Sequence, residues 1–62
     1  MKLKIKGIGA FKEVPATMAG IQDLYRDFPR LKQIVSESRD FEDALGGVLE
    51  YLNSHQLEAW LE

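Results

Sequence analysis

Residues 2–14 read KLKIKGIGAFKEV, and the first five of them alternate lysine with a branched aliphatic residue. Successive side chains of a β-strand point to opposite faces, so this alternation places Leu3 and Ile5 on one face and the three lysines on the other. The backbone of a strand must find hydrogen-bonding partners. The fold therefore depends on which segment pairs with residues 2–6.

Two partners for this strand are compatible with the sequence. Gly7 and Gly9 flank Ile8 and tolerate the positive φ values of a tight turn. Residues 10–14 then form a return strand, which Pro15 ends because proline cannot donate a backbone hydrogen bond. This return segment does not alternate strictly, and no later segment shows strand periodicity. Residues 2–6 are therefore expected to pair either with residues 10–14 or with another chain.

The rest of the chain shows helical periodicity. Apolar residues recur at spacings of three and four across residues 17–27, 29–37 and 40–52, and Asp40 is a good N-cap for the third of these segments. Asn53 followed by Gln56 resembles a capping box, which predicts a short last helix over residues 54–61. We therefore expect an α+β fold in a single small domain, residues 1–62, with a short N-terminal β-hairpin or single strand followed by three to four short α-helices.

The third predicted helix contains an adjacent glycine pair, Gly46 and Gly47. Two glycines cost about 2 kcal/mol of helix propensity relative to alanine. This cost indicates either a kink in the helix or the close approach of another backbone.

The composition is that of an ordinary globular domain. The chain has 62 residues, 45% of them hydrophobic and 29% charged, with no cysteine. A core of this size only just offsets the conformational entropy lost on folding, and neither a disulfide nor a thiolate metal site adds stability. We therefore expect self-association into a homodimer or a higher oligomer. Without an export signal or an apolar run of about 18 residues, we expect a cytoplasmic protein that makes no membrane contact.

The polar residues do not form a catalytic or metal-binding pattern. His55 is the single histidine, and His55 with Glu58 supplies only two of the three or four ligands that a metal site needs. Ser54 and His55 are neighbours in sequence, which is not the geometry of a nucleophile and its base. The acidic residues that follow Asp40 belong to the first turn of a helix, where they are normally solvated. We therefore expect no enzyme activity, no cofactor and no metal.

Charge is distributed unevenly along the chain. Residues 1–36 carry seven lysines and arginines and three acidic residues, whereas residues 37–62 carry one arginine and seven acidic residues. This polarity favours a small interaction or regulatory protein that binds and modulates a larger protein partner. The residues expected to contact the partner come from the strand, the acidic helix and the C-terminal segment: Leu3, Ile5, Asp40, Glu42, Asp43, Glu50, Leu57 and Trp60.

The alternative function is a nucleic-acid-binding regulator that lays a basic N-terminal β-ribbon in a groove. Its expected contacts are Lys2, Lys4, Lys6, Lys12, Arg30 and Lys32. In the sequence, no aromatic residue is interleaved with the first three lysines, as base stacking on a single strand requires. Lysines also protect exposed strand edges from aggregation. We therefore rank this function second.

Overall fold

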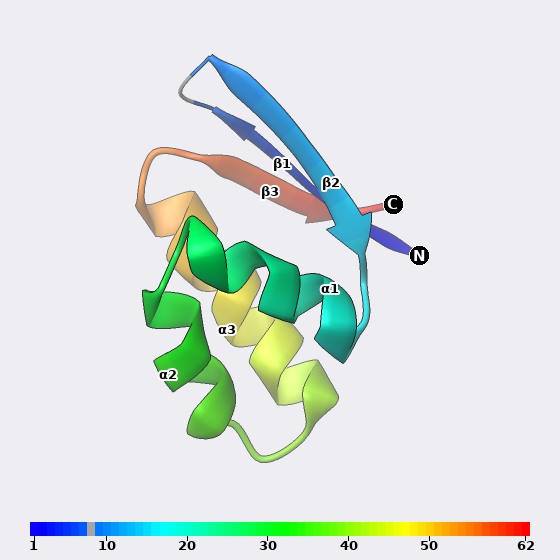
Figure 1. Cartoon of the computed structure of the whole chain (residues 1–62), viewed down its shortest axis with the longest axis vertical. Coiled ribbons are helices and arrows are strands. Elements are labelled where there is room, and N and C mark those ends of the chain that lie inside the picture. Colours follow the sequence, from blue (N-terminus) through cyan, green and yellow to red (C-terminus); the bar gives the residue numbers. More distant parts are fainter. Residues whose placement is uncertain (8) are drawn as a thin grey trace.

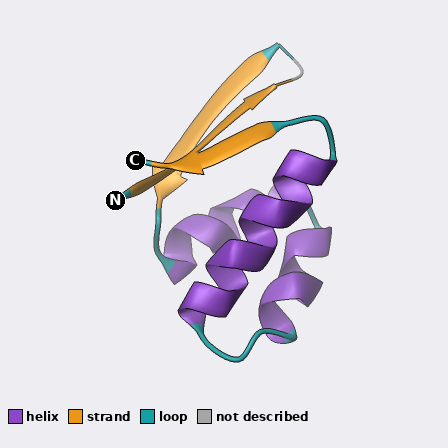
Figure 2. Cartoon of the chain, turned by 180° about the vertical axis from the view of Figure 1, so that it is seen from behind, coloured by secondary structure: helices purple, strands orange, loops and turns teal. Residues whose placement is uncertain are grey.

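The computed structural model describes residues 1–7 and 9–62, which form a three-stranded sheet covered on one face by three α-helices (Figure 1). The elements are β1 (Lys2–Gly7), β2 (Ala10–Pro15), α1 (Met18–Asp23) continued by the 3-10 turn η1 (Leu24–Arg26), α2 (Arg30–Ser36), α3 (Phe41–Ser54) and β3 (Glu58–Leu61). The strands are antiparallel in the order β2-β1-β3, and the end of the β1–β2 hairpin projects beyond the helices. Seen from behind, β3 and α3 lie in front of α1 and α2 (Figure 2).

The α+β class is confirmed, but the predicted arrangement, a hairpin or single strand followed by three to four helices, is wrong. The structure has a three-stranded sheet and three helices, because residues 58–61 form the strand β3 instead of a last helix. In residues 57–62, Leu57 and Leu61 fall on one side of a two-residue period, and the glutamates and Trp60 fall on the other, which is the pattern of a strand. The same apolar residues also fit one face of a helix. Periodicity over six residues does not separate these two structures.

Tertiary contacts explain why residues 58–61 form a strand and not a helix. The backbone groups of a central strand point alternately to both sides, so pairing with β2 alone would leave half of those of β1 without a partner. The backbone of Lys2 donates to and accepts from that of Glu62, with both N–O distances 2.8 Å, and the register continues to Lys6 opposite Glu58. Both sides of β1 are thus occupied within one chain, which selects the hairpin from the two alternatives that the sequence left open.

The end of α3 turns the chain back toward β1. Gln56 has a φ of 66°, and the N–H of Leu57 donates to the carbonyl of Leu52 at 3.3 Å, closing the last turn of the helix. Leu57 is then buried between the sheet and the helices. The predicted capping box at Asn53 and Gln56 is therefore wrong, because Asn53 lies in the last turn of α3 rather than at the start of another helix.

The two glycines at the hairpin turn have the conformations that the sequence predicted. Gly7 and Gly9 have φ values of 153° and 69°, which glycine adopts without a steric penalty. Residue 8, the centre of the predicted turn, lies outside the described residues. In addition, a Cβ on Gly7 would lie only 2.6 Å from a methyl carbon of Leu57. The turn therefore also permits the packing of Leu57.

The core lies between the inner face of the sheet and the helices. Leu3 and Ile5 of β1 pack with Val14 of β2 against helix residues, and Leu3 is completely inaccessible to solvent. The largest fully buried side chains of the helical segments are Ile21, Leu24, Leu31, Val48 and Leu52. Each such side chain contributes about 1.5–3 kcal/mol relative to an exposed position. The alternation in residues 2–6 thus separates a buried face of the sheet from a solvent-facing one.

Two local contacts fix the helices at their first turns. Thr17 caps α1, since its hydroxyl accepts a hydrogen bond from the N–H of Gly20 at 3.1 Å. Asp40 caps α3 as predicted, accepting from the N–H of Asp43 at 2.9 Å, and Asp43 in turn accepts from the N–H of Arg39. Among the described residues, none of the helices has the length and apolar character needed to cross a bilayer.

Candidate interaction face

The side of the sheet that faces away from the helices carries an ordered set of charged and aromatic side chains. The register places them in three rows across β2, β1 and β3. The rows are Phe11–Lys6–Glu58, Glu13–Lys4–Trp60 and Pro15–Lys2–Glu62. We call these nine residues the outer face. A stripe of lysines on β1 therefore runs between one glutamate on the side of β2 and two on the side of β3, and each flanking strand also carries one aromatic residue.

An aromatic pair crosses the central strand of the outer face. The rings of Phe11 and Trp60 approach from β2 and β3 to a centroid distance of 6.4 Å, with 60° between their planes. This tilted geometry is typical of attractive aromatic contacts. Lys4 lies on β1 directly opposite Trp60, and its side chain is only 20% exposed. Phe11, in contrast, is 57% exposed, so the pair presents apolar surface to solvent among charged neighbours.

Ion pairs hold the charged side chains of the outer face in place. Lys2 pairs with Glu13 at 2.9 Å and Lys4 with Glu62 at 2.8 Å, and the indole N–H of Trp60 donates to the other carboxylate oxygen of Glu62 at 3.2 Å. The hydrogen bond from Lys4 lowers the pKa of Glu62, and the same bond raises the pKa of Lys4. The hydrogen bond from Lys2 similarly lowers the pKa of Glu13.

The outer face has no net formal charge, because its three lysines are matched by three glutamates. Lys6 differs from the other two lysines: within the described part of the chain, the structure records no ion pair for it. It lies opposite Phe11 on one side and Glu58 on the other. Lys6 and Phe11 also line a shallow hollow of about 320 Å³ beside the hairpin turn, together with Gly7 and Gly9.

The structure distributes the predicted partner-contact residues over different parts of the molecule. Leu3, Ile5 and Leu57 are buried in the core, whereas Trp60 is half-buried on the outer face. The acidic residues Asp40, Glu42, Asp43 and Glu50 lie at the start of α3 and along it, on the helical side. Glu42, Asp43 and Glu50 line a shallow groove of about 470 Å³ between α2 and α3. The acidic set and Trp60 are therefore not parts of one surface.

The predicted nucleic-acid contacts are also separated. Lys2, Lys4 and Lys6 lie on the outer face, but Lys12 forms an ion pair with Asp27, which follows η1. Arg30 and Lys32 belong to α2. The six cations therefore do not form one basic surface.

Of the aromatic pair on the outer face, the sequence predicted Trp60 as a partner contact but neither Phe11 nor the contact between the two rings. Phe11 and Trp60 are distant from the lysines in sequence, and only strand pairing places Phe11 opposite Lys6 and Trp60 opposite Lys4. The signal that would have placed Trp60 on the same face as the lysines is the alternation over residues 57–62, once it is interpreted as a strand. Phe11 requires the register of the hairpin, which the sequence does not specify.

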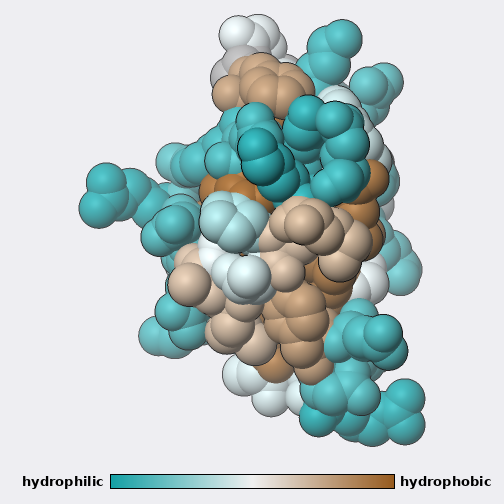
Figure 3. Space-filling model, turned by 90° about the vertical axis from the view of Figure 1, so that its right-hand side faces the viewer, coloured by the Kyte–Doolittle hydropathy of each residue, from teal (hydrophilic) through white to brown (hydrophobic). Residues whose placement is uncertain are grey.

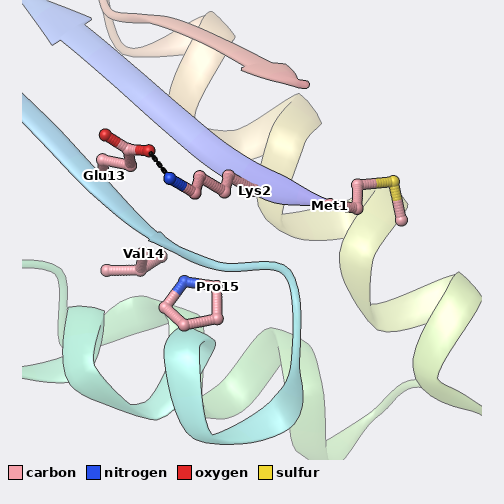
Figure 4. A pocket seen from close by; sticks show the side chains of 5 residues that line it. All are labelled: Met1, Lys2, Glu13, Val14 and Pro15. Atoms are coloured by element: carbon pink, nitrogen blue, oxygen red, sulfur yellow. Dashed lines mark ion pairs between the residues drawn. The ribbon is translucent and has the colours of Figure 1, made fainter.

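Two other surface features are less specific. A hollow of about 390 Å³ at the open end of the hairpin, opposite the turn, is lined by Met1, Val14, Pro15 and the Lys2–Glu13 ion pair, whose charges already satisfy each other (Figure 4). On the side of the molecule that carries both termini, apolar residues gather with hydrophilic ones around them (Figure 3). Within the described residues, no three histidine, cysteine, aspartate or glutamate side chains are placed to hold a metal ion.

Comparisons with known protein families, with curated proteins and with solved structures give no match to this chain. The inference of function therefore depends on the chemistry of the outer face.

Proposed function

We propose that this chain is a small non-enzymatic module that binds and modulates a larger protein, and that the Phe11–Trp60 pair is the centre of the contact surface. The exposure of Phe11 beside Trp60 is the observation that carries this proposal. Aromatic residues are enriched in the centres of protein interfaces and supply much of the binding free energy there, whereas charged residues form the rim. The outer face has this composition, with ion-paired lysines and glutamates around the aromatic pair.

A single-stranded nucleic acid is the second candidate partner, because aromatic rings among lysines on a sheet are also a platform for base stacking. The charge of the outer face favours a protein partner over a nucleic acid. Binding to phosphates requires an excess of cations, since the release of counterions drives the association. The outer face has no such excess, because its three lysines are matched by three glutamates, and two of these lysines are held in ion pairs. A balanced charged rim is compatible with a protein partner.

The single tryptophan gives a direct test of the nucleic-acid alternative. Trp60 is the only tryptophan of the chain, so its fluorescence reports on the outer face alone. We expect no saturable quenching when a deoxythymidine oligonucleotide is titrated into the protein at low salt. Saturable quenching that weakens steeply as salt is added would show that the outer face binds nucleic acid instead.

Site-specific photocrosslinking tests the protein contact itself. We expect p-benzoylphenylalanine at position 11 to form a nuclease-resistant protein adduct in extracts of the cells that make this chain. The same group at position 50, on α3, is the matched control and should give a much weaker adduct. Trp60→Ala should reduce the adduct from position 11, whereas Met18→Ala, which truncates an exposed apolar residue of α1, should not. Equal yields from positions 11 and 50 would refute the proposal.

A further inference from the structure

Within the described residues, the structure shows no hydrogen-bond partner for the outward backbone groups along one edge of β2. In an antiparallel sheet, successive residues of a strand direct their N–H and C=O groups to opposite sides. Lys2 of β1 bonds to Glu62 beside β3, so the odd-numbered residues of β1 face β2. Their register partners on β2, Lys12 and Val14, face β1 in return. The N–H and C=O groups of Phe11 and Glu13 therefore point outward, because β2 is an edge strand.

The other edge of the sheet is closed by a side chain. The N–H of Ala59 on β3 donates to Oδ1 of Asn53 at 3.0 Å, and Nδ2 of Asn53 donates to the carbonyl of Ala59 at 3.1 Å. The same Nδ2 also donates to the carbonyl of Leu49, which anchors the amide on α3. The side chain of Asn53 thus occupies the position that an added strand would take beside β3.

The open part of the β2 edge is short and well defined. Pro15 has no N–H, and a Cβ on Gly20 of α1 would lie 1.9 Å from the Pro15 carbonyl oxygen, so α1 closely covers that end. Lys12, the charged residue on the inner side of the edge, is already paired with Asp27. An incoming strand therefore does not leave the charge of Lys12 without a partner when it covers this edge.

We propose that the edge of β2 at Phe11 and Glu13 accepts an extended segment of the partner protein as a fourth strand. A row of alternating N–H and C=O groups is complementary to an extended polypeptide and not to a helix or a nucleic acid. The inference rests on the proposed function, because Phe11 belongs both to this edge and to the outer face. The residue of the segment that lies beside Phe11 is apolar or aromatic, since cross-strand aromatic pairs stabilise sheets.

The projection of the hairpin supports this assignment. The end of the hairpin that carries Phe11 extends beyond the helical layer (Figure 1), so an added strand can approach the edge without meeting α1. An exposed apolar side chain at an open strand edge also promotes aggregation unless a partner covers it. Phe11 thus combines an open backbone edge with an exposed apolar side chain, and strand addition would cover both.

A matched pair of substitutions at one position tests the backbone contact. Glu13→Pro removes an N–H that the fold itself does not use, and proline is tolerated in edge strands at such positions. Glu13→Ala loses the same side chain but keeps the N–H, so it controls for the loss of the ion pair to Lys2. The probes are peptides selected on the wild-type protein from a phage-displayed library of random dodecapeptides. We expect their affinity to fall about tenfold or more in Glu13→Pro and to change little in Glu13→Ala.

A measurement on the wild-type protein makes the test independent of how well the proline variant folds. Binding of a selected peptide should slow the hydrogen exchange of the Phe11 and Glu13 amides and leave that of the Leu61 amide, on the opposite edge, unchanged. Equal binding by the two variants, no protection of the Phe11 and Glu13 amides, or failure to select any peptide would overturn the inference.

The remaining outcomes identify the occupant and separate the two proposals. Peptides that lose affinity in Trp60→Ala but bind Glu13→Pro and Glu13→Ala alike would leave the proposed contact surface standing and overturn strand addition. Sedimentation measures whether the wild type self-associates and whether Glu13→Pro abolishes that association. If both hold, the assignment to a partner protein is overturned, and the occupant of the edge is a second copy of this chain.

Discussion

Replacing the glycines of α3 one at a time should give opposite effects on stability. The helix runs continuously from Phe41 to Ser54, so both Gly46 and Gly47 pay the propensity penalty of glycine in a helix interior. A Cβ added at Gly46 meets nothing within 4 Å, whereas one added at Gly47 lies 2.8 Å from Cγ2 of Ile34 on α2. The packing of Ile34 against the helix therefore accounts for the glycine at position 47. No contact in the structure accounts for the glycine at position 46.

The magnitudes follow from these two environments. Gly46→Ala should raise the free energy of unfolding by about 1 kcal/mol, the propensity difference between the two residues. For a domain of this size, such a gain raises the Tm by about 4–8 °C. Gly47→Ala has the same propensity gain but must displace Ile34, and overpacking typically costs about 1–3 kcal/mol. We therefore expect Gly47→Ala to lower the free energy of unfolding by about 1 kcal/mol.

Urea denaturation followed by circular dichroism measures both effects, and a double-mutant cycle isolates the contact. Ile34→Ala removes Cγ2, so Gly47→Ala should become stabilising in that background. If Gly47→Ala stabilised the wild type as much as Gly46→Ala does, the close packing of α2 on α3 would be refuted. A loss of stability in Gly46→Ala would contradict the open space at Gly46, where no atom of the described residues lies within 4 Å of an added Cβ.

The remaining predictions concern the contacts that hold the sheet. Gly20→Ala should lower the free energy of unfolding by about 2 kcal/mol or more in thermal melts, because its Cβ would overlap a backbone carbonyl of β2; unchanged melting would contradict that close approach. Asn53→Ala should cost about 1–2 kcal/mol in the same melts and expose the edge of β3, and an unchanged Tm would indicate that its amide does not clamp that edge. Since the folded-state pKa values of Glu13 and Glu62 are lowered, their contribution to stability is present above pH 4.5 and is lost as pH falls through the lowered values. Urea melts across this acid range should show a smaller loss of stability for the Glu13→Gln, Glu62→Gln double variant, and equal slopes would refute the ion pairs.

The sequence correctly predicted the elements whose signals are local. Asp40 caps α3 because a carboxylate at that position satisfies free N–H groups of the first turn, whatever the rest of the chain does. Leu3 and Ile5 are buried because strict alternation separates the two faces of a strand. That same burial removes both residues from the surface where the sequence had placed them as partner contacts.

The last ten residues show where local signals are insufficient. The apolar residues after Asn53 fit a helix and a strand equally well, so the choice depends on whether β1 needs a second neighbour. A strand there satisfies the backbone of β1 and places Leu57 in the core, which a terminal helix cannot do at the same time. Asn53 then clamps β3 instead of starting a helix.

By itself, the sequence determined that residues 2–6 form a strand with a buried and a charged face, and that helices follow it. These features depend on side-chain period and capping, which act over a few neighbouring residues. Only the tertiary structure decided which strands flank β1, and therefore that Phe11 and Trp60 meet across its lysines. Register and strand order depend on backbone hydrogen bonds between segments far apart in the chain, and a single sequence carries no local signal for them.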